Sequence, residues 1–496
     1  MRPCILVFLM RYQKNRKLFS ALFLWFSFLG LSAEEYQFTR LPNIVHIVAD
    51  DIGYDDLSCY DSKDIKTPNL DRVAREGMRF TSFYAPSPVG TASRAAMLTG
   101  FYPQRIGLSQ TLYPYSKTGL HSNEVTIAEL LKSRGYITAC IGKWHLGHHP
   151  EFLPTQHGFD YFYGIPYSKD HGPERLGWEK LAGTVGYRNP PVPLMRGTNI
   201  VESPAMLAAL PERFAEEATK FMLENLNKPF YLHLAPVETH IPWLTTPAFH
   251  YKSAAGVFGD AVECVDWMLD EIMTVLDEMG LSENTLLVFS SDNGPLVHRN
   301  PELESIYGHA GHVRQDRVHL LREGKHQGFY EGGVRVPLLM RWLGKIPPQS
   351  ICNEIVAGFD LFTTFATMAG IKPSAEIRTD GKNILPLMFA RPGARSPHEA
   401  FFYYQEDALN AVRSGPWKLI FGELDNKGKM MHSSRDKLFL YNLETDLSER
   451  NNLADQNPEI VLRLQKMADQ MREDLGDTRR GMPGKNRRKA GTILSP

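Results

Sequence analysis

Short β-branched runs alternate with segments of helical periodicity from about residue 42 to residue 370, and this alternation constrains the fold more than any other feature. The strand candidates are residues 44–48, 136–141, 230–234, 285–289 and 335–340. The helix candidates between them include residues 124–133, residues 259–279, and a helix that opens at Thr67-Pro68 and ends at Gly77. Strands that alternate with helices pair in parallel. We therefore predict an α/β fold, with a mostly parallel sheet sandwiched by helices.

The chain changes character after about residue 398. Short apolar runs at residues 411–413, 417–421 and 438–441 are separated by turn-rich segments, and a helical pattern covers residues 458–475. We predict one large domain over residues 34–397 and a small C-terminal α+β domain over residues 398–496, built from an antiparallel sheet and a helix. We expect its basic tail, from residue 479, to form an extended surface strap, the alternative being an anion-binding arm.

Residues 1–33 have the composition of a secretory signal peptide. They carry five basic and no acidic side chains, and an apolar run from Leu18 to Leu31 is followed by Ser32 and Ala33. A basic start, an apolar core and small residues before the cleavage point are typical of export signals, and the run is short for a membrane span. An uncleaved anchor is the alternative. We expect an exported protein, periplasmic or extracellular, with no stable membrane span after cleavage.

Charge and cysteine content exclude other classes of protein. The chain has 55 Lys+Arg against 56 Asp+Glu, and without residues 1–33 the balance is 50 against 56. A mildly acidic chain offers no basic footprint for nucleic acid, so we expect no nucleic-acid partner. Five cysteines are too few for a disulfide scaffold, and no CxxC pair indicates structural zinc.

Two acidic pairs follow predicted strands directly. Asp50 and Asp51 come after residues 44–48, and Asp292 and Asn293 come shortly after residues 285–289. Ligands of open parallel sheets bind beyond the carboxyl ends of the strands. Three carboxylates and one amide oxygen converging there would suit a hard cation, Ca²⁺ in preference to Mg²⁺. The alternative is that each residue only forms a turn or caps a helix, as Asp and Asn often do.

Lysine and histidine residues follow other predicted strands. Lys143 and His145 come after residues 136–141, His240 comes after residues 230–234, and Lys325 precedes an EGGVR segment. Together they would form an anion pocket beside the cation, able to stabilise negative charge and to protonate a leaving oxygen. Taken singly, each fits a surface lysine or a packed histidine equally well. The combination points to an anionic ester, and the residue types alone do not distinguish phosphate from sulfate.

Several motifs, in family order and over essentially the whole mature chain, resemble the type I sulfatase family. They are residues 42–53 (PNIVHIVADDIG), 67–71 (TPNLD), 92–100 (ASRAAMLTG), 142–147 (GKWHLG), 291–294 (SDNG) and 331–335 (EGGVR). The segments most similar to the arylsulfatase A and N-acetylgalactosamine-6-sulfatase branch are residues 164–168 (GIPYS), 170–173 (DHGP), 417–419 (WKL) and 440–443 (LYNL). The ASR and GKWH contexts favour a sulfatase over a phosphatase or phosphodiesterase of the same fold.

The resemblance implies an alkaline-phosphatase-like core with the small C-terminal domain beside it. It implies that residues 34–397 are the catalytic-type domain, acting on sulfate esters of aryl groups or sugars by attack at sulfur. The implied calcium ligands are Asp50, Asp51, Asp292 and Asn293. The residues implied to act on sulfate or on the leaving group are Lys143, His145, His240 and Lys325, with Ser168 in support and Arg94 orienting the nucleophile.

Position 90 departs from the family pattern. The family's nucleophile is a Cys or Ser that a formylglycine-generating enzyme oxidises to formylglycine, and the residue aligned with it is Gly90. Glycine has no Cβ, so it cannot become an aldehyde whose hydrate attacks sulfur. Thr91 lies one residue off, and Ser87 lies three residues early. The formylglycine-generating enzyme is therefore an expected partner only of a chain with Cys or Ser at position 90.

Three explanations of Gly90 stay open. The protein is a pseudosulfatase that binds sulfated glycans without turnover, or Gly90 is a single-base change from a Cys or Ser codon, or a glycine is written in place of a modified residue. A sulfated small molecule or saccharide is the expected ligand under each of them.

Overall fold

The computed structural model describes residues 38, 40–172, 190–297, 321–325, 328–371, 379–422 and 437–493. The chain divides into two units, residues 1–36 and 37–496, and every described residue belongs to the second. The predicted signal peptide lies outside the described residues. None of the helices that the structure describes combines the length and the apolar composition needed to cross a bilayer.

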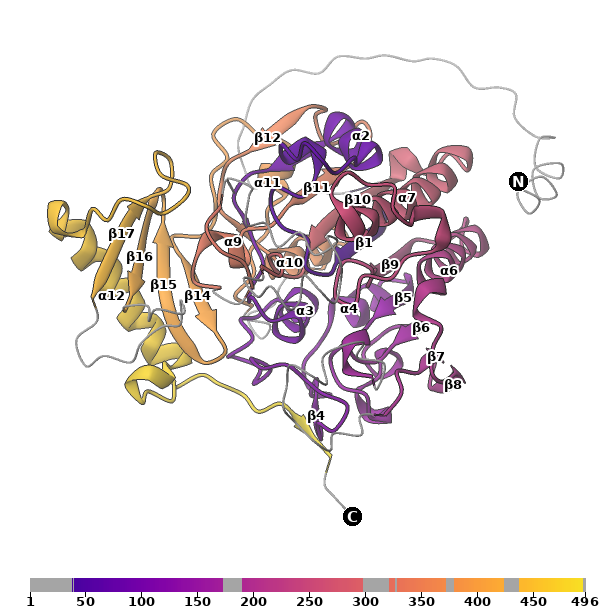
Figure 1. Ribbon diagram of the computed structural model, residues 1–496, viewed down its shortest axis with the longest axis horizontal. Coiled ribbons are helices and arrows are strands. Elements are labelled where there is room, and N and C mark those ends of the chain that lie inside the picture. Colours follow the sequence, from indigo (N-terminus) through magenta and orange to yellow (C-terminus); the bar gives the residue numbers. More distant parts are fainter. Residues whose placement is uncertain are drawn as a thin grey trace. The chain divides into compact units, whose positions relative to one another are not determined.

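Within the described residues, ten strands form one sheet in the order β12-β2-β11-β10-β1-β9-β5-β6-β7-β8 (Figure 1). In chain order they are β1 (Asn43–Ala49), β2 (Met78–Phe80), β5 (Ile137–Lys143), β6 (Tyr161–Ile165), β7 (Leu194–Arg196), β8 (Asn199–Glu202), β9 (Phe230–Ala235), β10 (Thr285–Ser291), β11 (Leu338–Arg341) and β12 (Ser350–Cys352). The five central strands, from β10 to β6, pair in parallel, and antiparallel pairs lie toward both edges. The predicted mostly parallel sheet is confirmed.

Helices cover both faces of this sheet. Val45 and Ile47 of β1 belong to a buried cluster with apolar side chains of α2, α6 and α7, whereas the intervening His46 meets Phe365 of α10 on the opposite face. This alternation is what a strand covered on both sides requires. The helices of this part are α2 (Pro68–Glu76), α3 (Gly90–Thr99), α4 (Ile127–Ser133), α6 (Leu210–Glu224), α7 (Gly256–Glu278), α9 (Glu331–Val334), α10 (Asp360–Met368) and α11 (Leu385–Met388).

Two predicted boundaries differ from the structure for local reasons. The helix predicted from residue 124 begins only at Ile127, because Thr126 caps it: Thr126 Oγ1 accepts from the Glu129 amide, and the Glu129 carboxylate accepts from the Thr126 amide. The strand predicted over residues 335–340 begins at Leu338. The residues before it form the short helix α9, whose two glycines pack closely against backbone of residues 322–324 and 328.

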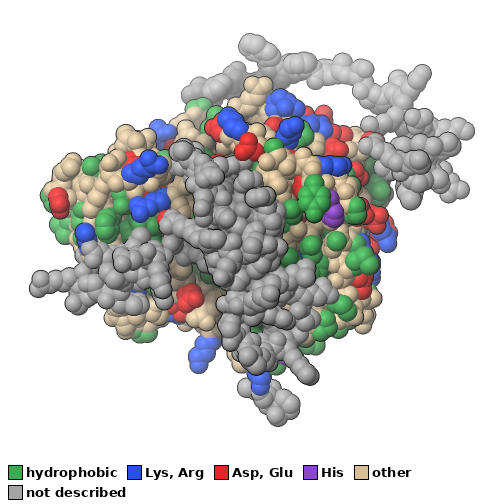
Figure 2. All heavy atoms as spheres, in the orientation of Figure 1, with side chains coloured by type: hydrophobic (Ala, Val, Ile, Leu, Met, Phe, Trp, Pro, Cys, Tyr) green, Lys and Arg blue, Asp and Glu red, His purple; other side chains and the backbone are tan. Residues whose placement is uncertain are grey.

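The C-terminal part is a four-stranded antiparallel sheet backed by a helix, as predicted (Figure 1). Its elements are β14 (Phe401–Gln405), β15 (Ala408–Ser414), β16 (Trp417–Phe421), β17 (Leu438–Asn442) and α12 (Pro458–Leu475). Aromatic side chains of β14 share one buried cluster with Tyr84, Tyr102 and Phe359 of the larger part. On the face seen in Figure 2, basic and acidic side chains are interspersed.

The described end of the basic tail lies as a strap against the larger part. Strand β18 (Gly491–Thr492) pairs antiparallel with β4 (Thr118–Gly119). Just before it, the Arg488 guanidinium donates to both carboxylate oxygens of Glu124, at 2.6 and 2.7 Å. Such a two-pronged ion pair fixes geometry as well as charge.

A buried ion cluster joins the C-terminal sheet to the larger part. Lys418 Nζ of β16 lies 2.9 Å from Glu331 Oε1 and 2.7 Å from Glu449 Oε1, and all three side chains are fully buried. Glu331 also accepts from the Tyr84 and Tyr403 hydroxyls and is the first residue of α9. Because the amide of Gly332 in turn donates to the Arg322 carbonyl, this cluster holds the segment that carries Lys325.

Lys418 decides the charge state of both carboxyl groups. Burial opposes ionisation of Glu331, but Lys418 and two nearby arginines outweigh it and lower the pKa of Glu331. Burial and the charge of Glu331 raise the pKa of Glu449 to about 7, against the attraction of Lys418. Because the folded state raises the pKa of Glu449, it holds the proton on this group more tightly than the unfolded chain does. The resulting stabilisation is fully present at a pH below the ordinary pKa of glutamate and is lost as the pH rises through 7.

We expect Lys418→Met to destabilise the protein by about 3–5 kcal/mol near pH 7.5, because it leaves two carboxylates buried without their shared ammonium group. The loss should shrink toward pH 5, where a proton on Glu449 replaces the missing charge. Urea unfolding followed by circular dichroism at both pH values measures it. The control is Lys485→Met, which breaks the exposed Lys485–Glu473 pair and should hardly move the midpoint. Equal losses in the two variants, or no pH dependence, would contradict the assignment.

Candidate active site

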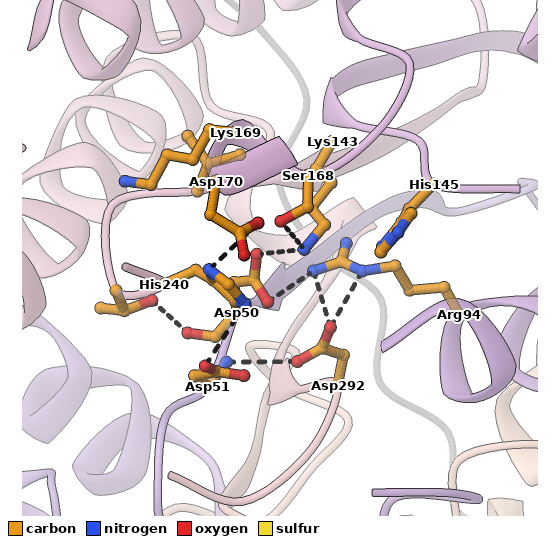
Figure 3. Close-up of polar contacts among 12 residues, drawn as sticks. Asp50, Asp51, Arg94, Lys143, His145, Ser168, Lys169, Asp170, His240 and Asp292 are labelled. Atoms are coloured by element: carbon orange, nitrogen blue, oxygen red, sulfur yellow. Dashed lines mark hydrogen bonds and ion pairs between the residues drawn. The ribbon is translucent and has the colours of Figure 1, made fainter. Parts of the chain in front are cut away.

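The ends of two adjacent central strands bring the predicted acidic residues together. Strand β1 pairs with β10 in parallel with Ala49 opposite Ser291, so the residues that follow the two strands emerge side by side. The amide of Asp292 donates to the Ala49 carbonyl at 3.0 Å, and the amide of Asp51 donates to Asp292 Oδ1 at 3.2 Å. Figure 3 shows Asp50, Asp51 and Asp292 facing one another.

Two residues of this cluster have backbone conformations that side chains rarely adopt. Asp51 has φ 59° and His145 has φ 62°, both in the left-handed region. Each follows a central strand, Asp51 after β1 and His145 after β5. Residues held in this region by their surroundings concentrate at functional sites. The local backbone thus turns both side chains out of the strand direction at the edge where the acidic residues meet.

Three basic side chains balance the three buried carboxylates. Lys143 Nζ lies 2.7 Å from Asp50 Oδ2, Lys325 Nζ lies 2.6 Å from Asp51 Oδ2, and Arg94 Nη2 lies 2.9 Å from Asp292 Oδ2. Arg94 also lies 3.6 Å from Asp50 Oδ1 (Figure 3). A buried charge without a partner would be very costly, so each of these carboxylates depends on its cation.

The same neighbours shift the acidic pKa values in opposite directions. Burial opposes ionisation of Asp50, but Lys143, His240 and Arg94 together lower its pKa. Burial raises the pKa of Asp292 to about 7, with the charge of Asp50 adding to it and Arg94 opposing it. A bound cation would favour the ionised form of Asp292 and so offset the effect of its burial.

Lys143 and Ser168 lie together on one side of the carboxylates. Lys143 is the last residue of β5, and its Nζ donates to Ser168 Oγ at 3.1 Å as well as to Asp50. Ser168 follows β6, the strand beside β5. The pair therefore comes from neighbouring strand ends, which is where its sequence positions place it.

His240 and Lys325 lie together on another side. His240 Nδ1 is 2.9 Å from the Ile241 carbonyl, so in the neutral ring Nδ1 carries the proton. His240 Nε2 then presents its lone pair to Lys325 Nζ at 3.3 Å. Burial opposes the charge of Lys325, but Asp51 outweighs it and raises the pKa of the lysine. The result is an ammonium group held between the Asp51 carboxylate and the His240 imidazole.

His145 is tied to the segment that follows α3. Its Nε2 lies 3.0 Å from the Leu112 carbonyl, and its ring is almost fully buried. Burial, followed by the charges of Lys143, His171 and Arg94, lowers the pKa of His145 well below its ordinary value. The imidazole is therefore neutral, with Nε2–H donating to Leu112 and Nδ1 left as an acceptor.

Gly90 is the first residue of α3, and the position of its absent side chain faces the cluster. A Cβ built on Gly90 would lie 2.9 Å from Asp292 Oδ2 and 3.7 Å from Asn293 Oδ1. Its φ is outside the left-handed region, so the backbone there accepts an ordinary side chain. Only the Asp292 carboxylate would have to shift. Because Gly90 has no side-chain carbon that could be oxidised, formylglycine cannot form at this position.

The two hydroxyl side chains near Gly90 are engaged elsewhere. Thr91 Oγ1 is fully buried and accepts from the Leu112 amide at 3.2 Å. Ser87 Oγ accepts from the Val89 amide at 3.2 Å, within the turn before α3. Neither hydroxyl forms a hydrogen bond to a predicted site residue among the described contacts. These two hydroxyls are thus engaged away from the site, whereas the buried Oγ of Ser93 in α3 has no hydrogen-bond partner among the described residues.

Sequence reasoning missed three charged residues beside the site. Asp170 Oδ1 lies 3.9 Å from His240 Nδ1, and Asp170 and Lys169 directly follow Ser168 (Figure 3). Lys169 is buried and donates to the Glu238 carbonyl at 3.4 Å; burial lowers its pKa to about 8, with the Glu238 charge opposing. The available signals were adjacency in sequence to Ser168 and His240 and, for Asp170, its place in the DHGP segment that resembles the family.

The donor set fits a hard divalent cation. One ligand atom from each of Asp50, Asp51 and His240 lies within 4.8 Å of the others. Asp292 and Asn293 join them through hydrogen bonds, since Asn293 Nδ2 donates to Asp51 Oδ1 at 2.6 Å. Carboxylate and amide oxygens are the ligands that Ca²⁺ and Mg²⁺ prefer, which favours the aspartates and Asn293 over the imidazole.

Comparisons with known proteins agree with this arrangement. The Sulfatase family matches residues 42–371, and the C-terminal region of aryl-sulfatase matches residues 396–489. Arylsulfatase A of Homo sapiens is 37% identical over 458 residues, which cover 86% of this chain and 87% of that protein. N-acetylgalactosamine-6-sulfatase of Canis lupus familiaris is 34% identical over 399 residues, which cover 77% and 72%.

A solved structure shows the same fold. The crystal structure of Ps i-CgsB in complex with k-i-k-neocarrahexaose superposes with a TM-score of 0.71 at 28% identity, covering 87% of this chain and 93% of that one. The sheet order, the strand-end cluster and both family matches lead to one assignment. The chain belongs to the sulfatase family, the enzymes that hydrolyse sulfate esters, and it has relatives among the arylsulfatases and the N-acetylgalactosamine-6-sulfatases.

Proposed function

We propose that this chain binds sulfate esters of aryl groups or sugars in a calcium-dependent pocket, and that hydrolysis at sulfur depends on the residue at position 90. One observation carries the proposal. The absent Cβ of Gly90 faces Asp292 and Asn293 at 2.9 and 3.7 Å, while the remaining residues implied by the family pattern lie around the same strand ends.

Calcium would be held by Asp50, Asp51, Asp292 and Asn293. When bound, it would hold an anionic ester oxygen next to the carboxylates and offset their mutual repulsion. Arg94, Lys143 and Lys325 now balance these carboxylates directly. With a cation present, the same three side chains would be released in part toward a second anion, the sulfate group.

The surrounding side chains would divide the remaining work. Lys143 and Ser168 would bind sulfate oxygens, because they come from adjacent strand ends on one side of the cluster. His145 would join them only with a proton on Nδ1, since its Nε2–H donates to the Leu112 carbonyl. Lys325, charged and 3.3 Å from His240 Nε2, would give a proton to the departing alcohol oxygen and would then regain a proton from solvent. Arg94, fully buried against Asp292, would orient whatever group stands at position 90.

Gly90 favours a second function, binding of sulfated glycans without turnover. No oxygen or sulfur nucleophile stands at this position, and the hydroxyls of Thr91 and Ser87 are hydrogen-bonded to backbone amides. The two functions share one pocket and differ only in whether the ester bond breaks. Under this second function the chain with Gly90 only binds its ligand, whereas a chain with Cys or Ser at position 90 would be the hydrolase.

The proposal also includes where the protein acts and how the chain is divided into domains. We place cleavage after residue 33, a periplasmic or extracellular location, and a boundary between the two folded parts near residue 397. Substrates in such a location would be sulfated small molecules or saccharides. The named relatives and the complex of Ps i-CgsB with neocarrahexaose support this choice of ligand class.

Gly90→Cys, coexpressed with a formylglycine-generating enzyme, should release 4-nitrophenol from 4-nitrophenyl sulfate. The unaltered chain should release none, because it lacks the group that attacks sulfur. Gly90→Ala is the matched control, since it adds the Cβ that must displace Asp292 but no group that can be oxidised. Mass spectrometry of the peptide from residue 83 to residue 94 would verify the aldehyde.

Inactivity of Gly90→Cys, with the aldehyde present, would contradict the proposal that the rest of the pocket is competent. Faster cleavage of 4-nitrophenyl phosphate than of the sulfate would favour a phosphatase instead. Turnover by the unaltered chain would show that another group acts as the nucleophile.

Removal of calcium by EGTA should abolish binding of 4-nitrophenyl sulfate to the unaltered chain, measured by calorimetry. Asp51→Asn should weaken calcium binding about tenfold or more, since it removes one of three charged oxygen ligands. Asp61→Asn is the control, because Asp61 is exposed beside Lys63. Unchanged calcium affinity in Asp51→Asn, or an equal loss in the control, would argue against the site.

A further inference from the structure

Four aromatic rings form a continuous ladder that leads from the candidate site to the surface. His145 meets His171 at a ring-centroid distance of 5.5 Å, His171 meets Tyr113 at 4.8 Å, and Tyr113 stacks on Tyr115 at 5.3 Å with an interplanar angle of 4°. Exposure rises along the ladder, from 4% for His145 and 5% for His171 to 37% for Tyr113 and 56% for Tyr115.

The outer rings are held in place relative to the site. Leu112, directly before Tyr113, accepts from His145 through its carbonyl and donates from its amide to Thr91 of α3. Residues 113–116 form a tight turn, in which the Tyr113 amide donates to Ser116 Oγ at 2.8 Å and the Ser116 amide donates to the Tyr113 carbonyl at 2.9 Å. The tyrosines therefore lie on a short turn that is anchored through Leu112 to both helix α3 and His145.

Core packing does not account for this pair. Tyr113 and Tyr115 belong to neither of the described buried clusters that contain the central sheet and the C-terminal sheet. They stack on each other, and Tyr115 keeps more than half of its surface exposed. Tyrosine offers a large, rigid face with a polar tip, which suits a ligand that has both flat apolar faces and hydroxyl groups.

We propose that Tyr113 and Tyr115 form a binding subsite for the sugar rings that follow a sulfated ring, so that the preferred ligand is a sulfated oligosaccharide rather than a single-ring sulfate. This inference deepens the proposed function and rests on it. A sulfate beside Lys143 would lie at the inner, buried end of the ladder, and the more exposed rings of Tyr113 and Tyr115 lie farther out. The subsite is reached only by a ligand of two or more rings.

A single-ring aryl sulfate and an oligosaccharide therefore make different contacts. The aryl ring of 4-nitrophenyl sulfate would stay at the inner, buried end of the ladder. An oligosaccharide would extend past Tyr113 to Tyr115. The contribution of Tyr113 and Tyr115 is therefore measured by the difference in affinity between the two ligands, and not by the affinity for either ligand alone.

The test compares binding of 4-nitrophenyl sulfate with that of size-fractionated tetrasaccharides from chondroitin 6-sulfate, carrageenan and heparin, by calorimetry with calcium present. At least one tetrasaccharide should bind the unaltered chain about tenfold more tightly than the aryl sulfate. Tyr115→Ala should remove most of that gain, because it removes one aromatic contact with the tetrasaccharide. Binding of the aryl sulfate should change less than twofold, because this ligand does not reach Tyr115. Tyr115→Phe, which keeps the ring, should retain most of the gain.

Tyr251→Ala is the matched control, because Tyr251 is 89% exposed in the segment before α7 and lies outside the ladder. Three results would overturn the subsite: no tetrasaccharide gain in the unaltered chain, a gain that survives in Tyr115→Ala, or an equal loss of both ligands in that variant. Failure of every sulfate to bind would instead refute the proposed function itself. Thermal unfolding of Tyr115→Ala confirms that the comparison concerns a folded protein.

Discussion

Burial of three neighbouring carboxylates at the ends of β1 and β10 is the constraint on which the rest of the site depends. Asp50, Asp51 and Asp292 are nearly inaccessible to solvent, and parallel pairing of the two strands forces them together. Like charges at such distances are tolerated only when opposite charges stand beside them. Arg94, Lys143 and Lys325 supply those charges from three different segments. The anion pocket is thus the counterpart of the acidic cluster, because cations gathered to balance aspartates are also the groups that a sulfate would contact.

This constraint explains why the sequence predicted so much of the site. Asp50 and Asp292 directly follow hydrophobic strands, and Lys143 is the last residue of one. Because parallel strands end at a common edge, the convergence of these residues follows from the alternation of strands and helices. Lys325 and Arg94 follow no strand of the central sheet. Their placement depends on α9 and α3, whose packing has no periodic signal in the sequence. The family resemblance identified Arg94, and Lys325 was included in the cationic set because it precedes the EGGVR segment, not because of strand periodicity.

The residues that sequence reasoning missed are those whose positions depend on contacts between distant segments of the chain. Lys169 and Glu238 read as ordinary charged residues, and only the fold buries them between two strand-end segments. Glu331 and Lys418 likewise form a buried pair across 87 residues of chain, which no local pattern predicts. Tyr113 and Tyr115 are visible in the sequence as a Tyr-Pro-Tyr turn, but their relation to His145 depends on the hydrogen bond from its ring to Leu112. Each of these depends on tertiary contacts between segments distant in sequence.

Gly90 shows that the stability of the acidic cluster does not depend on the side chain at position 90. A Cβ at this position would press on Asp292 Oδ2, the oxygen that Arg94 holds, so glycine relieves a contact that a functional side chain would impose. The charge balance of the cluster does not involve residue 90 at all. A glycine at position 90 therefore gives the fold, the acidic cluster and its cations no physical reason to change. The structure accordingly keeps the three carboxylates and their three cations together around a position that carries no side chain.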